Sequence, residues 1–224
     1  MTAAGRALEL VENGQVVGLG TGRAAAEFIR ALALRMKEDG IRVEGVPTSN
    51  ATAELARKVG IPLRPMSELE TLDVTFDGAD EVDPALDLIK GYGGALVREK
   101  IVATASRKLV ILVGHEKLVA RLGQRGKLPV EVVPSAASLC RRRLEALGFP
   151  ADLRPGSTAS PFLSDNGNWI LDCRVERIPN PAQLDSALLA IPGVVGTGLF
   201  VQMADHVIVQ DGDAVEIRHR PPSP

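Results

Sequence analysis

The sequence predicts an α/β protein, with a doubly wound parallel sheet and a second, smaller α+β domain. Strand-like and helix-like segments alternate through the first half of the chain, the order that produces a parallel sheet with helices packed on it. Apart from its two end residues, segment 108–114 consists of Leu, Val and Ile, which is typical of a parallel strand covered on both faces. The order of segments changes near residue 123, and this change predicts the second domain.

The elements of the first half follow from apolar spacing and from the residues that end them. Apolar side chains recur at helical spacing over 24–39, and Gly60 followed by Pro62 marks the end of a shorter helix. In chain order we expect a helix at 3–12, a strand at 15–20, a helix at 24–39, a strand at 41–47, a helix at 52–60, a strand at 72–78, a helix at 94–105 and a strand at 108–114. Right-handed crossovers between such strands give a Rossmann-like sheet.

The second half follows the order strand, helix, strand, strand, helix, strand, which matches a ferredoxin-like α+β unit. We expect these elements at 129–134, 138–148, 150–155, 169–176, 181–193 and 194–200. Two further strand-like segments flank Gln210-Asp211-Gly212-Asp213 and predict a hairpin that returns to the first domain. The expected domains are therefore an α/β domain at 1–127 plus 205–224 and a small ferredoxin-like domain at 128–204.

Composition excludes several classes of partner. The net charge of the 224-residue chain is −2, so the field of the whole protein gives no reason to expect nucleic acid or an anionic membrane. No apolar run approaches the roughly 18 residues of a membrane-spanning helix. Cys140 and Cys173 are isolated and form no CxxC motif, which indicates a reducing compartment and, by default, a cytoplasmic location. The histidines show no metal-ligand spacing, so no metal is expected.

The segment GLGTGRAAAEF (18–28) takes a strand through Gly-x-Gly-x-Gly into a helix. Glycines let backbone amides face a ligand, and a helix N-terminus adds partial positive charge, so we expect a compact phosphate-binding loop. A plain strand–helix turn is the alternative. The dinucleotide fingerprint requires its third glycine three residues after the second, where this chain has Arg23, and this argues against a nicotinamide site.

The segment PTSNATAEL (47–55) also lies where a strand passes into a helix. Its hydroxyl groups can cap that helix. The same hydroxyls can line a pocket beside the glycine loop, and the sequence leaves both interpretations open.

Residues 77–100, DGADEVDPALDLIKGYGGALVREK, hold the densest set of reactive side chains. Five carboxylates occupy the first eleven positions, a lone lysine enters a glycine-rich turn, and Glu99 follows on a predicted helix. A solvated acidic loop and a magnesium site are alternatives, but neither explains why Lys90 and the glycine turn follow at once. A lysine can stabilise a developing oxyanion, and a partly desolvated glutamate can act as a general base.

Together these motifs resemble the A-type ribose-5-phosphate isomerase family. GLGTG with its following helix, TSNAT, FDGADEVD, KGYGGALVREKIVA and ILVGHEK occur in the family's order and spacing. PVEVVP, NGNWILDC and IPGVVGTGLF resemble its second half, so the resemblance covers nearly the whole chain. The combination of DGADE with KGxGGAL-x-REK is its most specific part.

The resemblance implies isomerisation of D-ribose 5-phosphate to D-ribulose 5-phosphate through a cis-enediolate, with no metal and no organic cofactor. Glu99 would move a proton between C2 and C1, and Lys90 would stabilise the enediolate oxygen. Asp77 and Asp80 would bind sugar hydroxyls and assist ring opening. The implied substrate-binding residues are Thr21, Gly22, Arg23, Ala24, Thr48, Ser49, Thr52, Asp77, Gly78, Ala79, Asp80, Lys90, Gly91, Tyr92, Gly93 and Lys117. A homodimer is expected, with a tetramer as the alternative.

The chain departs from the family's pattern at three places. Arg23-Ala24 stand where the family usually has Ser-Thr, which removes two hydroxyls and adds a guanidinium. Tyr92 replaces a smaller or non-aromatic residue, and His115-Glu116 stand where Asp or Ser usually precedes the lysine. Since Glu99 and Lys90 are present, these changes put fine substrate recognition in doubt rather than activity.

Two other functions compete with this interpretation. A phosphosugar-sensing module of a regulator predicts an attached DNA-binding region, whereas two other predicted domains account for the 224 residues. A relative of the coenzyme A transferases predicts a covalent thioester at Glu99 and a requirement for acyl-CoA.

Overall fold

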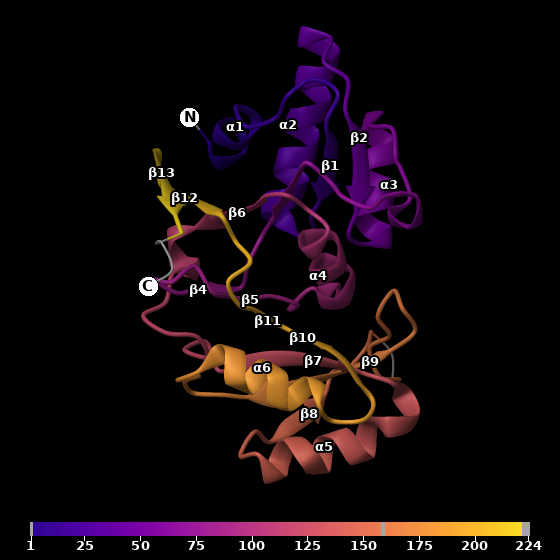
Figure 1. Ribbon diagram of the computed structural model, residues 1–224, viewed down its shortest axis with the longest axis vertical. Coiled ribbons are helices and arrows are strands. Elements are labelled where there is room, and N and C mark those ends of the chain that lie inside the picture. The colour runs from indigo at the N-terminus through magenta and orange to yellow at the C-terminus, as the bar shows by residue number, and fades with distance from the viewer. Residues whose placement is uncertain (1, 158–159, 221–224) are drawn as a thin grey trace. The chain divides into compact units, whose positions relative to one another are not determined.

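The computed structural model of the chain describes residues 2–157 and 160–220 (Figure 1). The chain divides into two compact units. Unit 1 comprises Met1–Ala79, Arg98–Lys117 and Gln202–Pro224, and unit 2 comprises Asp80–Val97 and Leu118–Val201. The domains expected from the sequence, 1–127 plus 205–224 and 128–204, stay a prediction.

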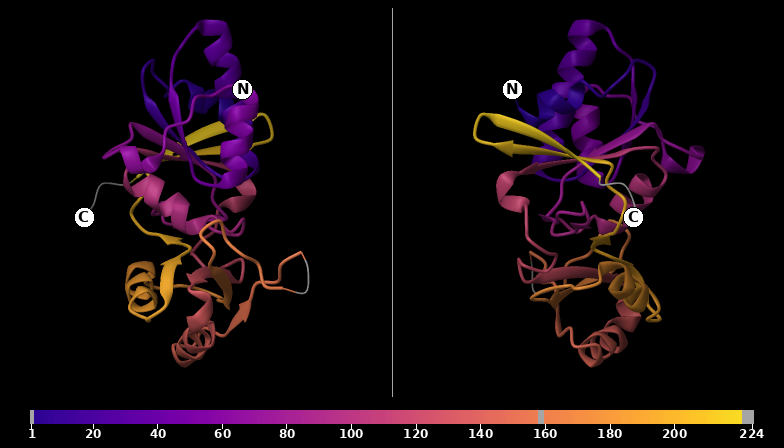
Figure 2. Two further views of the ribbon diagram at one scale, coloured as in Figure 1. Left: turned by 90° about the vertical axis from the view of Figure 1, so that its right-hand side faces the viewer. Right: turned by 60° about the vertical axis from the view of Figure 1, so that its left-hand side comes forward.

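Unit 1 is built on a six-stranded sheet in the order β13-β12-β6-β3-β1-β2. Its strands are β1 (Val16–Leu19), β2 (Glu44–Pro47), β3 (Val74–Asp77), β6 (Leu109–Gly114), β12 (His206–Asp211) and β13 (Ala214–His219). Neighbouring strands are parallel except β12 and β13, which form the antiparallel hairpin drawn in yellow in Figure 2. The predicted parallel sheet and the returning hairpin are confirmed.

Helices cover both faces of this sheet. They are α1 (Ala3–Leu8), α2 (Arg23–Asp39), α3 (Asn50–Val59) and α4 (Leu96–Thr104). Residues of the first three pack in one core with Val17, whereas Val102 of α4 packs in a separate cluster with Val16. Because successive residues of a strand point to opposite faces, the two clusters lie on opposite sides of the sheet, and the doubly wound class is confirmed.

Unit 2 contains a four-stranded antiparallel sheet in the order β10-β7-β9-β8. Its elements are β7 (Lys127–Val132), α5 (Ala137–Ala146), β8 (Ala151–Leu153), β9 (Trp169–Arg174), α6 (Pro181–Leu189) and β10 (Val194–Thr197). They follow one another in the order strand, helix, strand, strand, helix, strand, as the ferredoxin-like interpretation requires. Buried aliphatic side chains and both cysteines form its core, so the predicted α+β unit is confirmed.

One predicted strand was wrong in its extent. Segment 194–200 is divided: β10 ends at Thr197, and β11 (Leu199–Phe200) joins a different sheet with β5 (Leu88–Ile89) and β4 (Glu81–Val82). Gly198 permits the change of sheet, because a Cβ there would lie 2.3 Å from the carbonyl oxygen of Lys90. Strands of two residues are too short for an alternating pattern, which is why the sequence did not predict this sheet.

The described elements also include three short 3₁₀ helices, η1 (Met66–Glu68), η2 (His115–Lys117) and η3 (Pro134–Ala136). Within residues 2–157 and 160–220, no helix combines the length and the apolar composition needed to cross a bilayer.

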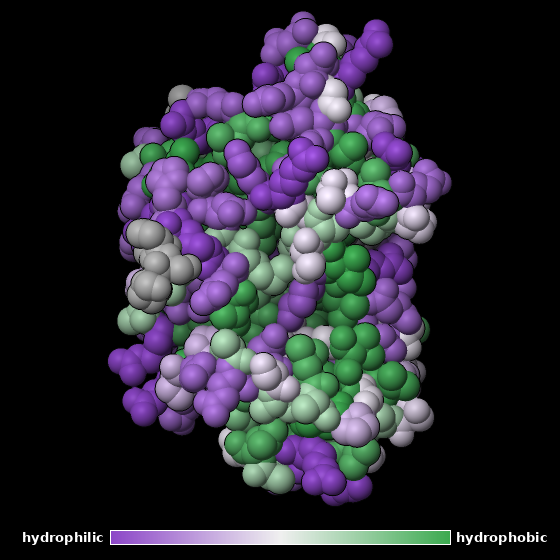
Figure 3. All heavy atoms as spheres, in the orientation of Figure 1, coloured by the Kyte–Doolittle hydropathy of each residue, from purple (hydrophilic) through white to green (hydrophobic). Residues whose placement is uncertain are grey.

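Apolar side chains reach the surface of unit 2 around α6 (Figure 3). Leu147, Leu189 and Val195 are between 40% and 46% exposed. Exposed apolar residues of this kind are ordinary on folded proteins.

Candidate functional site

Four segments of unit 1 leave the parallel sheet at its carboxyl edge. β1 is followed by Gly20, β2 by Thr48 and β6 by the short η2, while β3 ends on Asp77. The registers pair Leu19 with Phe76, and Asp77 with Ile111, so these ends lie along one edge of one sheet. Ligands of open α/β sheets bind at this edge, and the unit 1 residues predicted from the loops after β1, β2, β3 and β6 therefore share one region.

Asp77 closes the loop after β1. Its Oδ1 accepts hydrogen bonds from the backbone amides of Thr21 (3.0 Å) and Gly78 (2.7 Å), and the residue is 1% exposed. Gly20 lies so close that a Cβ there would come within 2.2 Å of Oδ1. The second glycine of the GLGTG motif thus provides the space that the carboxylate of the DGADE motif occupies, and two motifs far apart in sequence form one structure.

A cluster of hydroxyl groups lies against the same loop. Thr21 Oγ1 lies 2.8 Å from Thr48 Oγ1 and donates to Ser49 Oγ at 2.9 Å. Thr48 Oγ1 donates to the Leu19 carbonyl, and Thr52 Oγ1 donates to the Gly20 carbonyl. The hydroxyls that the sequence assigned either to capping or to a pocket therefore brace the glycine loop.

Capping of α3 is also present. Ser49 is its N-cap residue and accepts a hydrogen bond from the amide of Thr52 at 3.1 Å. Thr48, Ser49 and Thr52 are all buried. The capping interpretation is confirmed, and direct contact of these hydroxyls with a ligand stays a prediction.

The N-terminus of α2 carries the residues that depart from the family's pattern. Gly22 is its N-cap residue with a φ of 102°, a conformation that glycine adopts without strain, and no side chain caps the helix there. Arg23 is exposed and Ala24 is half-buried. The arrangement leaves a guanidinium beside a helix end that favours anions.

Three other predicted residues of unit 1 lie in loops after strands. Gly78 and Ala79 follow β3 and are half-buried. Lys117 ends η2, directly after β6, and is also half-buried. These positions agree with a role at the carboxyl edge of the sheet.

Glu99 lies in the first turn of α4 and is 5% exposed. A carboxylate near a helix N-terminus is stabilised by the helix dipole. Burial of the side chain keeps water away from its oxygens, which is the setting in which a carboxylate can act as a general base. The expectation that Glu99 lies on a helix is confirmed.

Lys90 follows β5 in unit 2 and is 2% exposed. Its amide donates to the carbonyl of Gly198 at 2.8 Å, and its ammonium lies 5.4 Å from the centroid of the Phe200 ring. Buried lysines are rare unless the charge has a use or a partner, so this burial is consistent with an electrostatic role.

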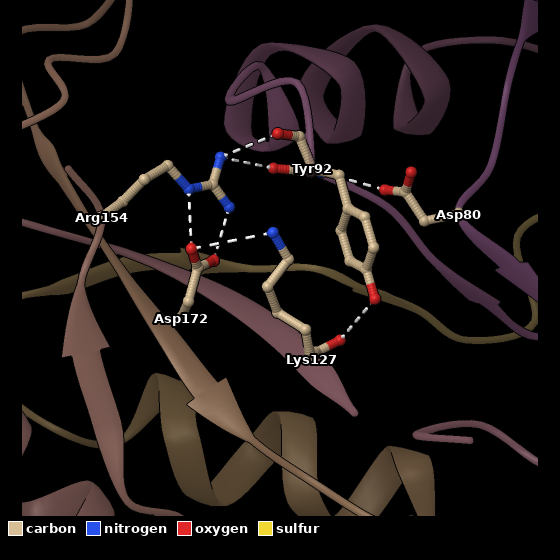
Figure 4. A network of polar contacts seen from close by, with 6 residues as sticks. Asp80, Tyr92, Lys127, Arg154 and Asp172 are labelled. Carbon is tan, nitrogen blue, oxygen red and sulfur yellow. Dashed lines mark hydrogen bonds and ion pairs between the residues drawn. The ribbon is translucent and has the colours of Figure 1, made fainter. Parts of the chain in front are cut away.

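The glycine turn that follows Lys90 is joined to Asp80. The Tyr92 amide donates to Asp80 Oδ2 at 2.9 Å, and the Tyr92 hydroxyl donates to the Lys127 carbonyl at 3.2 Å (Figure 4). Burial, and then the nearby carboxylates of Glu81 and Asp80, raise the pKa of Tyr92 above its usual value. The phenol therefore stays protonated and remains a donor at any physiological pH.

The acidic residues of segment 77–100 do not all serve one purpose. Glu81 is fully buried and accepts hydrogen bonds from the amides of Gly123 and Arg125, both at 2.7 Å. Asp83 accepts from the amides of Ala85 and Asp87, both at 2.9 Å. Glu81 therefore holds the 123–125 loop and Asp83 holds its own turn, and the sequence pattern did not separate these two structural carboxylates from Asp77 and Asp80.

Arg154 is the residue that sequence reasoning missed. It follows β8, is 8% exposed, and donates to the carbonyl oxygens of Gly91 (3.0 Å) and Tyr92 (3.1 Å). A single arginine between Leu153 and Pro155 belongs to no spacing pattern, so only the folded chain reveals this contact.

The described residues contain no group of three or more His, Cys, Asp or Glu side chains with the arrangement of a metal site.

Comparisons with known proteins extend this picture. The family model described as ribose 5-phosphate isomerase A (phosphoriboisomerase A) matches residues 44–214. The chain belongs to the ribose 5-phosphate isomerase A family. The resemblance stated from the motifs is thereby confirmed.

Individual relatives agree along nearly the whole chain. Ribose-5-phosphate isomerase A of Gloeobacter violaceus is 52% identical over 217 residues, covering 96% of this chain and 94% of the relative. That of Roseiflexus castenholzii is 49% identical over 214 residues, covering 95% and 92%.

Two solved structures share the fold. Ribose 5-phosphate isomerase A from Methanocaldococcus jannaschii has a TM-score of 0.94 and 41% identity, covering 97% of this chain and 96% of its own. A D-ribose-5-phosphate isomerase in complex with phospho-erythronic acid has a TM-score of 0.95 and 40% identity, with the same coverage.

Proposed function

We propose that this protein interconverts D-ribose 5-phosphate and D-ribulose 5-phosphate through a cis-enediolate. The observation that carries the proposal is the burial of a carboxylate, Glu99, and of an ammonium, Lys90, within the motifs of this isomerase family. A proton next to a carbonyl is only weakly acidic. Its removal needs a positioned base together with groups that stabilise the oxygen gaining charge.

Glu99 is proposed as the base that removes the proton from C2 and returns it to C1. One carboxylate can serve both carbons, because they are adjacent and a cis-enediolate presents one face to it. Lys90 is proposed to stabilise the enediolate oxygen. Asp77 and Asp80 are proposed to bind sugar hydroxyls and to assist ring opening. Proton transfer within one intermediate needs neither a metal nor an organic cofactor, and the proposal includes none.

The remaining predicted residues are proposed to hold the substrate. The loop at Thr21, Gly22, Arg23 and Ala24 and the side chain of Lys117 offer backbone amides and cations suited to a phosphorylated sugar. Thr48, Ser49, Thr52, Gly78, Ala79, Gly91, Tyr92 and Gly93 complete the proposed set. Binding of the distant phosphate supplies free energy that positions the reacting carbons.

The cellular setting is also a proposal. We infer a cytoplasmic homodimer, with a tetramer as the alternative, that acts in the non-oxidative branch of the pentose phosphate pathway. Buried free thiols in unit 2 support a reducing compartment. Light scattering of the purified protein distinguishes a dimer from a tetramer.

The direct test measures formation of ribulose 5-phosphate from ribose 5-phosphate by purified protein in EDTA. Wild-type turnover is expected, with a loss in kcat of roughly 10²–10⁴-fold in Glu99→Gln, the range for a removed general base. Comparable activity in a folded Glu99→Gln variant would remove Glu99 from the mechanism. Absence of turnover by folded wild type would overturn the proposed function.

A binding measurement complements the kinetic test. Phospho-erythronic acid, the ligand of one related structure, carries a planar carboxylate like the charged face of an enediolate. We expect it to inhibit turnover competitively. Binding without turnover would favour a phosphosugar sensor, and an acyl-CoA requirement would favour a transferase.

A further inference from the structure

The turn formed by residues 90–94, Lys-Gly-Tyr-Gly-Gly, is not restricted to one backbone conformation by its own sequence. Gly91 and Gly94 have φ angles of 103° and 86°, and the Gly94 amide donates to the Gly91 carbonyl at 3.0 Å. Glycine-rich backbone has many alternative conformations and loses much entropy when it is fixed. Because glycines do not fix the turn by themselves, interactions from elsewhere in unit 2 are needed to hold it. The shape of the turn matters because Lys90 is its first residue.

The Arg154 guanidinium supplies such interactions. Nη1 donates to the carbonyl oxygens of both Gly91 and Tyr92, as Figure 4 shows. Hydrogen bonds from a charged donor are stronger than neutral ones. The Phe162 ring lies 5.6 Å from the guanidinium carbon, so the cation is also held from a second side.

Asp172, on β9, fixes the guanidinium in turn. Arg154 Nε donates to its Oδ2 at 3.0 Å, and Nη2 donates to its Oδ1 at 2.5 Å. Lys127 Nζ lies 3.8 Å from the same carboxylate and 4.2 Å from the centroid of the Tyr92 ring. The planar fork of arginine binds the carboxylate with Nε and Nη2 while Nη1 reaches the turn, and the single ammonium of lysine cannot reproduce that geometry.

The bonds to the Gly91 and Tyr92 carbonyls also orient the amides of the residues that follow. The Gly91 carbonyl and the Tyr92 amide belong to one peptide group, in which a planar trans bond directs them to opposite sides. Arg154 binds the carbonyl, and Asp80 Oδ2 accepts from the amide at 2.9 Å. The Tyr92 carbonyl and the Gly93 amide likewise belong to one peptide group, so the bond from Arg154 to this carbonyl fixes the direction of that amide. Gly93 is an exposed residue.

We propose that Arg154, held by Asp172, is a positioning residue for the isomerase reaction. It sets the orientation of the two peptide groups after Lys90 and, through one of them, the position of the Asp80 carboxylate. Arg154 acts through the turn and touches no reacting atom. The inference rests on the proposed function.

The chain provides a matched control in a second ion pair between β8 and β9. Arg174 of β9 pairs with Asp152 of β8 at 3.4 Å, an arginine and an aspartate like Arg154, just after β8, and Asp172 of β9. Those side chains are 70% and 72% exposed, whereas the Arg154 side chain is 9% exposed. Surface pairs of this kind contribute little, so Arg174→Met removes a similar ion pair that touches no part of the turn.

The experiment measures kcat, KM and binding of phospho-erythronic acid for Arg154→Met and Arg174→Met. In Arg154→Met we expect kcat to fall by roughly 10–100-fold, the effect of displaced catalytic groups, and binding to weaken. Arg174→Met is expected to match wild type. Arg154→Lys restores the charge without the fork, and we expect it to fold while kcat stays below that of wild type.

A double variant separates positioning from stability. Arg154→Met alone leaves the Asp172 carboxylate with the more distant ammonium of Lys127, 3.8 Å away, and adding Asp172→Asn removes that poorly compensated charge. We expect the midpoint of urea unfolding to recover in the double variant while kcat stays low, since the turn carbonyls still lack their donor. Recovery of kcat together with stability would overturn the inference, as would wild-type kinetics in a folded Arg154→Met protein.

The proposed function and this inference fail in different ways. Absence of turnover by folded wild type would overturn both. Wild-type turnover with unaltered kinetics in Arg154→Met would overturn the positioning role alone.

Discussion

At the scale of single residues, burial and partners decide what a carboxylate does. Asp77 and Glu81 are both buried acids within five positions. Asp77 accepts from the amide of Thr21 at the carboxyl edge of a parallel sheet, whereas Glu81 accepts from two amides of its own unit's 123–125 loop. Two carboxylates that look alike in the sequence therefore differ in role: Asp77 is a candidate ligand-binding group, and Glu81 is a structural one.

Arg23 gives a residue-scale prediction. It is exposed at the N-terminus of α2, where the family usually has a hydroxyl, and we expect its guanidinium to contact the substrate phosphate. A charged hydrogen bond contributes about 1.5–3 kcal/mol, so Arg23→Ala should raise KM about tenfold or more with a smaller effect on kcat. Steady-state kinetics with ribose 5-phosphate test this, and Arg30→Ala, an exposed arginine further along α2, is the control. An unchanged KM would contradict the contact.

At the scale of elements, the candidate groups around Asp77 depend on how strands of unit 1 pass into the segments that follow them. β1 and β3 are neighbours in register, and the loop after β1 closes on Asp77 through the space left at Gly20. Hydroxyls at the start of α3 brace the same loop by binding the carbonyls of Leu19 and Gly20. The loop is therefore held by the carboxylate of Asp77 and by the hydroxyls of Thr48 and Thr52, all of which lie outside it.

Gly20→Ala tests this dependence. The added Cβ would lie 2.5 Å from the Cα of Asp77, a backbone atom that cannot rotate away. Overpacking of this kind costs about 1–3 kcal/mol, and we expect that loss in the free energy of unfolding measured with urea.

Gly78→Ala is the matched control for stability. A Cβ there would meet nothing nearer than 3.8 Å, and Gly78 has no positive φ. Its unfolding free energy should stay close to that of wild type. Equal stability of the two variants would show that the approach of Gly20 to Asp77 is not tight.

At the scale of the molecule, two separate cores support two kinds of architecture. Unit 1 packs helices on a parallel sheet, and unit 2 packs two helices on an antiparallel one. Proposed site residues occur in both: Asp77 and Glu99 in unit 1, and Asp80 and Lys90 in unit 2.

The two thiols report on the core of unit 2 alone. Cys140 and Cys173 are both buried there, and burial raises the pKa of each thiol, that of Cys173 to about 12. Because the thiolate is the reactive form, native protein at pH 8 should react with a disulfide reagent far more slowly than a free cysteine. In urea we expect both thiols to react as unit 2 unfolds, with Cys140→Ala and Cys173→Ala assigning each. Rapid labelling of native protein would contradict the burial of these groups.

The sequence by itself determined the fold class, the family and most strands and helices. Those properties reside in local patterns: apolar runs such as 108–114, helix ends such as Gly60, and motifs of fixed spacing such as GLGTG and DGADE. Each depends on neighbours in the chain, and a single sequence records such neighbours directly.

Only the tertiary structure decided which polar groups meet. The contact of Gly20 with Asp77 joins residues 57 positions apart, and the bonds from Arg154 to Gly91 and Tyr92 cross 63 and 62. The three-stranded sheet of β4, β5 and β11 likewise unites segments from distant parts of the chain. Such contacts follow from the packing of whole elements, and because no local pattern encodes them, Arg154 had no signal in the sequence.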